Sequence, residues 1–333
     1  LDRWPTLRHL PGPRTAPIYG KILAEQAKIL RRPLALGRAL RPHQWVKNGL
    51  VFLPLLFAVK VVWSTDDLTQ LPDLLITLGV VFLAFCAVSS GVYLINDLAD
   101  RASDRNHPLK RNRPIASGDL AVPAALASVV VLIGAGLVAL ALSDLVLLWI
   151  GLVYVGINLA YSVGAKNIVL VDVLAVAAGY VIRVAIGALA IGVIPSPWLY
   201  ATTAAGALFI VLGRRYAEVR LAGDDALDQQ SLAQRSVLSS YSGPFIGQLL
   251  TISATAAWLS YTLYTVEAPN LPQNGAMLLT VPLVTVGLFR YLYLLNTSKD
   301  AESPEHLIIK ALPMILSIVT WIAGSAAVLL WAA

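Results

Sequence analysis

Long runs of apolar residues alternate with short polar segments along most of the chain. Each run approaches or exceeds about 18 residues, the length that an α-helix needs to cross a hydrocarbon core of roughly 30 Å. The pattern predicts an all-α membrane protein whose nine transmembrane helices form one bundle. The predicted helices cover residues 46–63, 73–96, 121–143, 145–163, 169–193, 198–218, 244–265, 275–295 and 308–331. We expect Pro54 and Pro282, inside two of these ranges, to kink their helices.

The composition agrees with a membrane protein. Of 333 residues, 57% are hydrophobic and 13% are charged, whereas a soluble domain has about 25% charged residues. No contiguous third of the sequence supplies the polar surface of a water-soluble fold. The single cysteine, Cys86, excludes a disulfide within the chain. Residues 1–41 are polar and basic and predict a cytoplasmic tail, and residues 42–333 predict the nine-helix domain.

Lys and Arg residues are unevenly distributed between the predicted loops. Residues 1–47 hold ten of them and the loop after the second predicted helix holds five. By the positive-inside rule, the N-terminus and the even-numbered loops lie in the cytoplasm and the C-terminus lies outside. This orientation, together with attraction to anionic headgroups or phosphates, accounts for the net charge of +6. We therefore do not expect nucleic acid to be a partner.

Three aspartates follow the second predicted helix. Asp97, Asp100 and Asp104 are spaced i, i+3, i+7, so their carboxylates share one face if the helix continues. Mg²⁺ usually joins one or two carboxylates to substrate phosphates. We predict that these three residues bind Mg²⁺ and are catalytic. The alternative is a solvated helix end whose acids pair with Arg101 and Arg105.

A basic loop follows the aspartates at residues 105–118. Arg holds phosphate oxygens with two hydrogen bonds, and Lys supplies a point charge. Carboxylates for Mg²⁺ beside cations for phosphate predict a site for a pyrophosphorylated substrate, although such a loop can also serve only to set topology. The candidate substrate-binding residues here are Asn96, Arg105, His107, Lys110, Arg111 and Arg113. Lys110 is also a candidate catalytic residue.

Two motifs in this region resemble those of the UbiA superfamily of intramembrane prenyltransferases. They are Asn-Asp-x-x-Asp-x-x-x-Asp at 96–104 and Lys-Arg-x-Arg-Pro-Ile-Ala-Ser-Gly at 110–118. The resemblance extends over essentially the whole chain from about Arg41. Within the superfamily, the chain is similar to the decaprenyl-phosphate phosphoribosyltransferase branch. The segments that carry this closer similarity are 41–48, 106–110, 161–166 and 213–218.

The resemblance implies a UbiA-type bundle in a bacterial inner membrane with its active site on the cytoplasmic face. It implies transfer of 5-phosphoribose from 5-phosphoribosyl-1-diphosphate to decaprenyl phosphate, or another polyprenyl phosphate, with Mg²⁺ as the cofactor. The product would be a precursor of cell-wall arabinan. Both substrates and the lipid bilayer are then partners. The prenyl chain length, the number of Mg²⁺ ions and assembly into a homo-oligomer stay open.

Charged residues elsewhere extend the candidate site. Lys47, Tyr161 and Lys166 are candidate phosphate ligands, or alternatively interfacial anchors. Asp172 and Arg183 lie eleven residues apart in one predicted helix and therefore on nearly the same face. Ionisable residues at such depth normally face the bundle interior. We predict that both bind substrate and that Arg183 is catalytic and meets the lipid phosphate, the alternative being that it only fixes the helix by pairing.

A second polar cluster ends the sixth predicted helix. Its candidate substrate-binding residues are Arg214, Arg215, Tyr216 and Glu218. Asp224 and Asp228 follow at the spacing of a second Asp-rich motif, which holds another Mg²⁺ in aromatic-acceptor members of the superfamily. They are otherwise solvated loop acids.

Two other functions remain open at this point. One is transfer of an isoprenyl group from its diphosphate to an aromatic or quinone precursor, in which Asp224 and Asp228 would bind metal. The other is transport of a lipid phosphate, for which a site near the bilayer midplane is typical. The acids gather at one face instead, and only Arg183 indicates a pathway. His43 and His107 lack the spacing of zinc ligands.

Overall fold

The computed structural model describes residues 33–107, 110–222, 237, 240–268, 271–272, 274–298 and 311–331. Three sequence predictions fall partly or wholly outside this range. They concern residues 1–32 of the N-terminal tail, the pair Asp224 and Asp228, and the first residues of the last predicted helix, 308–310.

Helices occupy each of the nine predicted ranges, wholly or in part. The long α-helices are α3 (Leu71–Ala99), α6 (Val122–Ser143), α7 (Leu145–Val163), α8 (Val171–Ala190), α9 (Pro197–Ala222), α11 (Gly243–Glu267), α12 (Val281–Thr297) and α14 (Leu312–Trp331). The short ones are α2 (Leu53–Phe57), α4 (Arg101–Arg105) and α5 (Pro114–Ser117). The 3₁₀-helices are η1 (Pro42–Phe52), η2 (Lys110–Asn112), η3 (Ala165–Asn167) and η5 (Ala276–Thr280).

Six helical segments of the described chain are long and apolar enough to cross a membrane. They are Leu71–Ala99, Val122–Ser143, Leu145–Val163, Val171–Ala190, Ala276–Thr297 and Leu312–Trp331. Large apolar side chains on them are exposed, among them Leu142 at 84% and Val130 at 73%, as expected where lipid is the solvent. The all-α, multi-pass membrane class is therefore confirmed. The number of crossings and the sides of the termini stay predictions.

The first predicted helix, 46–63, is wrong in form. The chain forms η1 and then the short α2, and it turns back at Lys60, which has a left-handed φ of 61°. The indole nitrogen of Trp63 donates to the carbonyl oxygen of Leu55 at 2.9 Å and closes this turn. The helix therefore ends because the next residues fold back on it.

Neither internal proline kinks a helix. Pro54 lies in the first turn of α2, and Pro282 lies in the first turn of α12 after η5. Proline is favoured there because the amide hydrogen that it lacks has no partner within the helix. Both prolines therefore start α-helices at the points where 3₁₀ segments end.

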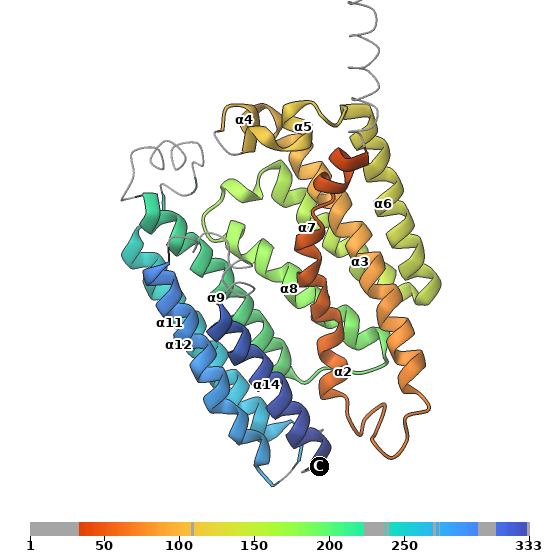
Figure 1. The fold of residues 1–333 in the computed structure, drawn as a ribbon, viewed down its shortest axis with the longest axis vertical. Coiled ribbons are helices and arrows are strands. Elements are labelled where there is room, and N and C mark those ends of the chain that lie inside the picture. Colours follow the sequence, from red (N-terminus) through yellow and green to blue (C-terminus); the bar gives the residue numbers. More distant parts are fainter. Residues whose placement is uncertain are drawn as a thin grey trace, which may run out of the picture.

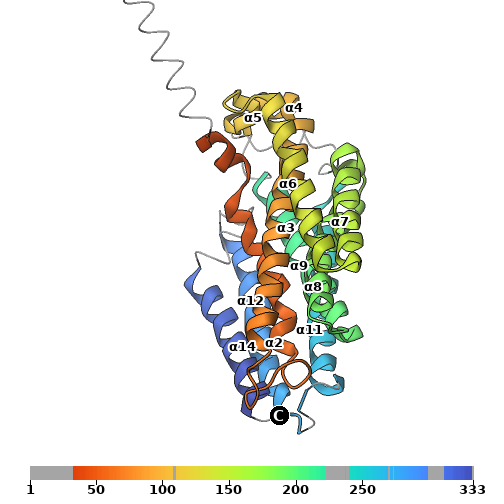
Figure 2. The ribbon, with the colours of Figure 1, turned by 90° about the vertical axis from the view of Figure 1, so that its right-hand side faces the viewer.

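The long helices run roughly along the long axis of the molecule (Figure 1 and Figure 2). The helices α3 and α6 pack together, α9 packs on α11, and α8 packs on α9. At one end of the bundle, α4 and α5 lie above α3 and beside the start of α6, and α14 finishes at the opposite end (Figure 1). We call the end that carries α4 and α5 the cap end.

The helix α8 connects the two main apolar cores. Ile186 of α8 packs in one core with Phe85 and Tyr154, and Val173 packs in the other with Phe209. This central position places the polar residues of α8 between the two halves of the bundle.

Candidate active site

Three of the cavities that the described residues line adjoin one another between the helices. The cap cavity has a volume of about 290 Å³, and its charged side chains are Asp100, Asp104, Lys110, Arg113, Lys166 and Arg215. The central cavity has a volume of about 310 Å³, and its charged side chains are Arg41, Lys47, Arg113, Arg183, Arg214 and Arg215. The apolar cavity has a volume of about 190 Å³, and its large apolar side chains include Leu50, Leu53, Phe57, Leu199, Tyr264 and Trp321.

The three cavities adjoin one another. Arg113 and Arg215 line both the cap and the central cavity, and Tyr180 and Ile210 line both the central and the apolar cavity. Among the described residues, six cations and no carboxylate line the central cavity. The cationic central cavity thus lies between the cap cavity, which carries both acidic and basic side chains, and the apolar cavity.

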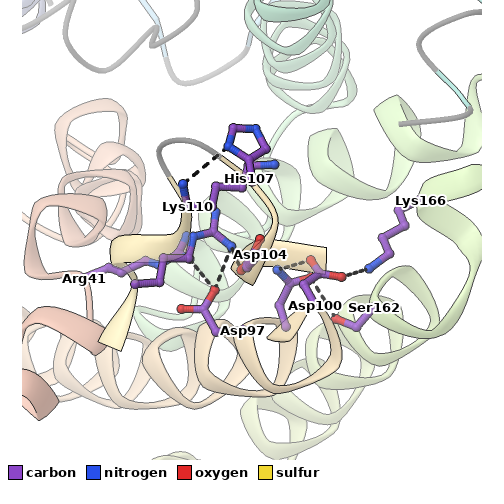
Figure 3. Close-up of polar contacts among 10 residues, drawn as sticks. Arg41, Asp97, Asp100, Asp104, His107, Lys110, Ser162 and Lys166 are labelled. Atoms are coloured by element: carbon purple, nitrogen blue, oxygen red, sulfur yellow. Dashed lines mark hydrogen bonds and ion pairs between the residues drawn. The ribbon is translucent and has the colours of Figure 1, made fainter. Parts of the chain in front are cut away.

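Asp97 and Asp104 share one cation (Figure 3). The Nη1 atom of Arg113 lies 3.1 Å from Asp97 Oδ1 and 2.7 Å from Asp104 Oδ2. Both acidic side chains are buried, with exposed fractions of 2% and 4%. Asp97 Oδ1 also accepts a hydrogen bond from Arg41 Nη2 at 2.5 Å. The spacing thus predicted correctly that these two acids face the same way.

Asp100 has separate partners. It caps the end of α3, and Lys166 pairs with its Oδ1 atom, as Figure 3 shows. The amide nitrogen of Asn96 donates to its other oxygen at 3.2 Å. Asp100 thus points toward Lys166 of η3 rather than toward Arg113. In the described chain, no three His, Cys, Asp or Glu side chains gather closely enough to hold a metal ion.

The cations that the acids meet are not the neighbours in sequence. Arg105 instead donates from Nε to the carbonyl oxygen of Ala116 at 3.2 Å and joins α4 to α5. The partners Arg41, Arg113 and Lys166 come from three segments that precede or follow α3. The alternative of a helix end neutralised by Arg101 and Arg105 therefore does not describe the ion pairs in this structure.

Arg183 is buried in α8 and lines the central cavity. Its guanidinium donates to Asn48 Oδ1 at 2.7 Å, to the carbonyl oxygen of Gly179 at 2.6 Å and to Tyr154 Oη at 2.9 Å. All three acceptors are neutral, so its charge lies without a paired carboxylate among the described residues. It does not pair with Asp172, although both lie on α8.

Asp172 anchors a second network at the first turn of α8. It accepts from Arg215 Nε at 3.0 Å and from the hydroxyl of Tyr241 at 2.7 Å. Burial, together with the hydrogen bond to Asp172, raises the pKa of the Tyr241 hydroxyl to about 12, so it stays a donor at neutral pH. Arg215 also donates to Glu218 at 2.6 Å. The network therefore fixes Arg215, which lines both the cap and the central cavity.

The comparisons with known proteins agree with this geometry. A model of the UbiA prenyltransferase family matches residues 51–319. The chain belongs to this family.

Curated relatives and solved structures extend this result. The chain is 33% identical to a decaprenyl-phosphate phosphoribosyltransferase from Mycobacterium tuberculosis over 86% of its own length and 91% of the relative. It is 32% identical to one from Corynebacterium glutamicum, over 80% and 78% of the two chains. A UbiA homologue from Archaeoglobus fulgidus bound to GPP and Mg²⁺ shares the fold, with a TM-score of 0.64, 18% identity and coverage of 89% and 99%.

Most of the other predicted site residues of this UbiA protein line a cavity, and two, Arg111 and Tyr216, do not. Lys47 and Arg214 line the central cavity, His107 and Lys110 line the cap cavity, and Asn96 and Tyr161 line both. Arg111 is exposed at the cap end. Tyr216 points elsewhere, because its hydroxyl donates to Asn296 Oδ1 on α12 at 2.9 Å.

Several lining residues escaped sequence analysis. Tyr154 and Asn158 of α7 line the central cavity together with the predicted Tyr161. The three follow one another at spacings of four and three residues, a polar stripe on an apolar helix that helical periodicity could have revealed. Tyr241 carries no local signal, since it acts through a partner far away in the sequence. Asn48 ends the segment 41–48 that carries the family similarity, but its partner Arg183 is equally distant in the sequence.

The donor set suits Mg²⁺ in this UbiA site. Carboxylate oxygens are the ligands that Mg²⁺ prefers, and one or two of them suffice when phosphate oxygens and water complete the shell. Asp97 and Asp104 already hold a positively charged group between them. The residues present therefore fit the ion, and the metal-binding roles of Asp97, Asp100 and Asp104 stay predictions.

Proposed function

We propose that this protein transfers 5-phosphoribose from 5-phosphoribosyl-1-diphosphate to a polyprenyl phosphate such as decaprenyl phosphate, at the cytoplasmic face of a bacterial inner membrane. The observation that carries the proposal is the order of the cavities, in which the cationic central cavity joins the charged cap cavity to the apolar one. This order suits a water-soluble diphosphate that meets a lipid phosphate. The names of the curated relatives select phosphoribose as the transferred group.

The donor belongs in the cap cavity. Lys110, Arg113 and Lys166 line it beside Asp100 and Asp104, so both phosphate-binding cations and metal-binding oxygens are at hand. Mg²⁺ bound there supplies positive charge that stabilises the leaving diphosphate. The cations of the chain orient the diphosphate and the 5-phosphate, and most of the catalytic effect then comes from positioning and charge.

The acceptor phosphate belongs beside Arg183 in the central cavity. A buried guanidinium whose three acceptors are neutral is costly without an anion, and a phosphate at this cavity provides one. Tyr180 lies less than one helical turn from Arg183 on α8, and it lines both the central and the apolar cavity. The prenyl chain can therefore leave the phosphate toward the apolar side chains.

The reaction needs no strong base, because the attacking phosphate oxygen is already an anion. This oxygen forms a bond to C1 of the ribose while the bond from C1 to the diphosphate oxygen breaks, and diphosphate leaves with the electron pair. Positive charge develops on the ribose ring during this step. The role of the described residues is to hold the two anionic substrates in line despite their mutual repulsion.

The test is a transfer assay with purified protein, decaprenyl phosphate, Mg²⁺ and 5-phosphoribosyl-1-diphosphate that is radiolabelled in the ribose. We expect the label to become extractable into organic solvent only when both substrates are present. The proposal fails if no lipid-extractable label forms while label from an isoprenyl diphosphate enters an aromatic acid. That second outcome would assign the protein to aromatic prenyl transfer.

A further inference from the structure

The acids of the cap end are already neutralised by cations of the chain itself. Arg113 lies between Asp97 and Asp104, and Lys166 pairs with Asp100. Asp97 and Asp104 are almost fully buried, whereas Arg113 is 26% exposed and lines both the cap and the central cavity. The bridging guanidinium can therefore be reached by an anion. Of the two carboxylates, Asp97 lines neither cavity, and Asp104 borders the cap cavity with 4% of its side chain exposed.

A divalent cation that bound these two carboxylates alone would have to displace Arg113. The displaced guanidinium would remain partly buried beside a doubly charged ion, and like charges at such distances repel strongly in a medium of low dielectric constant. A diphosphate that arrives with the ion removes this penalty, because its oxygens give the guanidinium a new partner. The same reasoning holds for Lys166 when Asp100 takes part.

We propose that Arg113 and Lys166 are exchangeable counter-ions, which compete with the divalent cation for Asp97, Asp104 and Asp100 until the diphosphate of the donor takes the two cations over. The free protein then binds Mg²⁺ weakly, and ion and donor enter together. This inference rests on the proposed function, since it assumes a diphosphate donor. Its distinctive consequence is that an arginine placed at a phosphate site weakens metal binding in the absence of phosphate.

The test measures binding of Mn²⁺, as a probe for Mg²⁺, to purified protein by the electron paramagnetic resonance signal of the free ion. In wild-type protein without diphosphate we expect weak binding, and Arg113→Gln should tighten it on the order of tenfold, a coupling of ordinary size between two ligands. Saturating inorganic diphosphate chelates Mn²⁺ and removes the free-ion signal, so binding of the Mn²⁺–diphosphate complex is then measured by equilibrium dialysis, and the variant should lose its advantage. A fixed structural role for Arg113, or one in phosphate binding alone, predicts no tightening.

Arg111→Gln is the matched control. Arg111 lies two residues away in the same basic segment and is exposed. Its loss changes the net charge equally, so a general loss of electrostatic repulsion would tighten Mn²⁺ binding in both variants. We expect a much smaller change in this control. Equal tightening in both variants, or none in Arg113→Gln, overturns the proposal.

Lys166→Gln provides a second variant in case Arg113→Gln does not fold. It removes the ammonium partner of Asp100 and should also tighten Mn²⁺ binding without diphosphate, and unchanged or weaker binding overturns the proposal. The measurement requires no turnover. If the wild-type protein transfers phosphoribose but neither variant binds Mn²⁺ more tightly, the exchange alone is refuted. If the wild-type protein makes no labelled lipid, the proposed function is refuted.

Discussion

At Gly187 of α8, an added Cβ atom would lie 2.1 Å from the carbonyl oxygen of Val51 in η1. The two backbones can touch only because glycine has no side chain. Arg183 lies one turn before Gly187 and donates to Asn48, one turn before Val51. The close approach therefore brings η1 near enough for Asn48 to hold the buried arginine.

Gly187→Ala should therefore destabilise the bundle. Overpacking of a tight contact costs about 1–3 kcal/mol, and here the opposing atom belongs to backbone and cannot rotate away. We expect a lower midpoint of thermal unfolding in detergent and a weaker affinity for polyprenyl phosphate, because Asn48 moves away from Arg183. Gly134→Ala is the control, since nothing lies within 4 Å of a Cβ at that position in α6. An equal loss in both variants would contradict the explanation.

The spacing of Arg183 and Asp172 illustrates what the sequence could and could not predict. Both residues lie on α8 and are buried, as their positions in an apolar run indicate. Pattern along one helix cannot tell which neighbouring helix faces each side chain, and the partners Asn48 and Arg215 lie 135 and 43 residues away. The depth of the residues was therefore predictable and their pairing was not.

The acidic motif follows the same rule. Helical spacing predicted that Asp97 and Asp104 face one side, whereas Asp100, which lies about 60° further round the helix at 3.6 residues per turn, meets Lys166 instead. The bounds of most long helices were predictable, since length and apolar composition are local properties. The reversal at Lys60 was not predictable, because the hydrogen bond from Trp63 to Leu55 that closes it forms only once the chain has turned.

Arg183→Lys should raise the KM for polyprenyl phosphate by about tenfold or more. The lysine keeps the charge but loses the forked geometry, and a hydrogen bond to a charged group contributes about 1.5–3 kcal/mol. The KM for 5-phosphoribosyl-1-diphosphate should change little, and steady-state kinetics with each substrate varied in turn measure both values. Arg290→Lys in α12, where the guanidinium stacks on Tyr293, is the control. A rise in the donor KM alone would contradict the placement of the acceptor phosphate.

Tyr241→Phe should lower both stability and donor use. It removes the hydroxyl that donates to Asp172, so we expect a loss of about 1–2 kcal/mol in the free energy of unfolding. Arg215 should also be held less firmly, and we expect kcat/KM for the donor to fall about tenfold. Additive effects of Tyr241→Phe and Asp172→Asn in a double-mutant cycle would contradict a shared network.

The stabilisation by Tyr241 should depend on pH in one direction. Its pKa is about 12 in the folded protein against an ordinary value of 10.0, so folding favours the protonated phenol. This contribution to the free energy of unfolding is complete below pH 10 and is lost as the pH rises through about 12. The difference in unfolding temperature between wild type and Tyr241→Phe should therefore stay constant from pH 7 to pH 9. A difference that shrinks within that range would show that another group is titrating.

Divalent ions and the cap-end acids should be needed together for turnover. Chelation with EDTA should abolish transfer and added Mg²⁺ should restore it, while Asp100→Ala and Asp104→Asn should each lower kcat by about 100-fold or more, as expected when charge stabilisation of the transition state is lost. Asp119→Asn is the matched control, because Asp119 lies at the same end in an exposed ion pair with Arg38 at 3.2 Å, and such pairs contribute about 0–1 kcal/mol. The initial rate of lipid-extractable label at saturating Mg²⁺ measures all three variants. Unchanged turnover in Asp100→Ala would mean that Lys166 pairs with this acid for structural reasons alone, and the metal would then have to depend on Asp97 and Asp104.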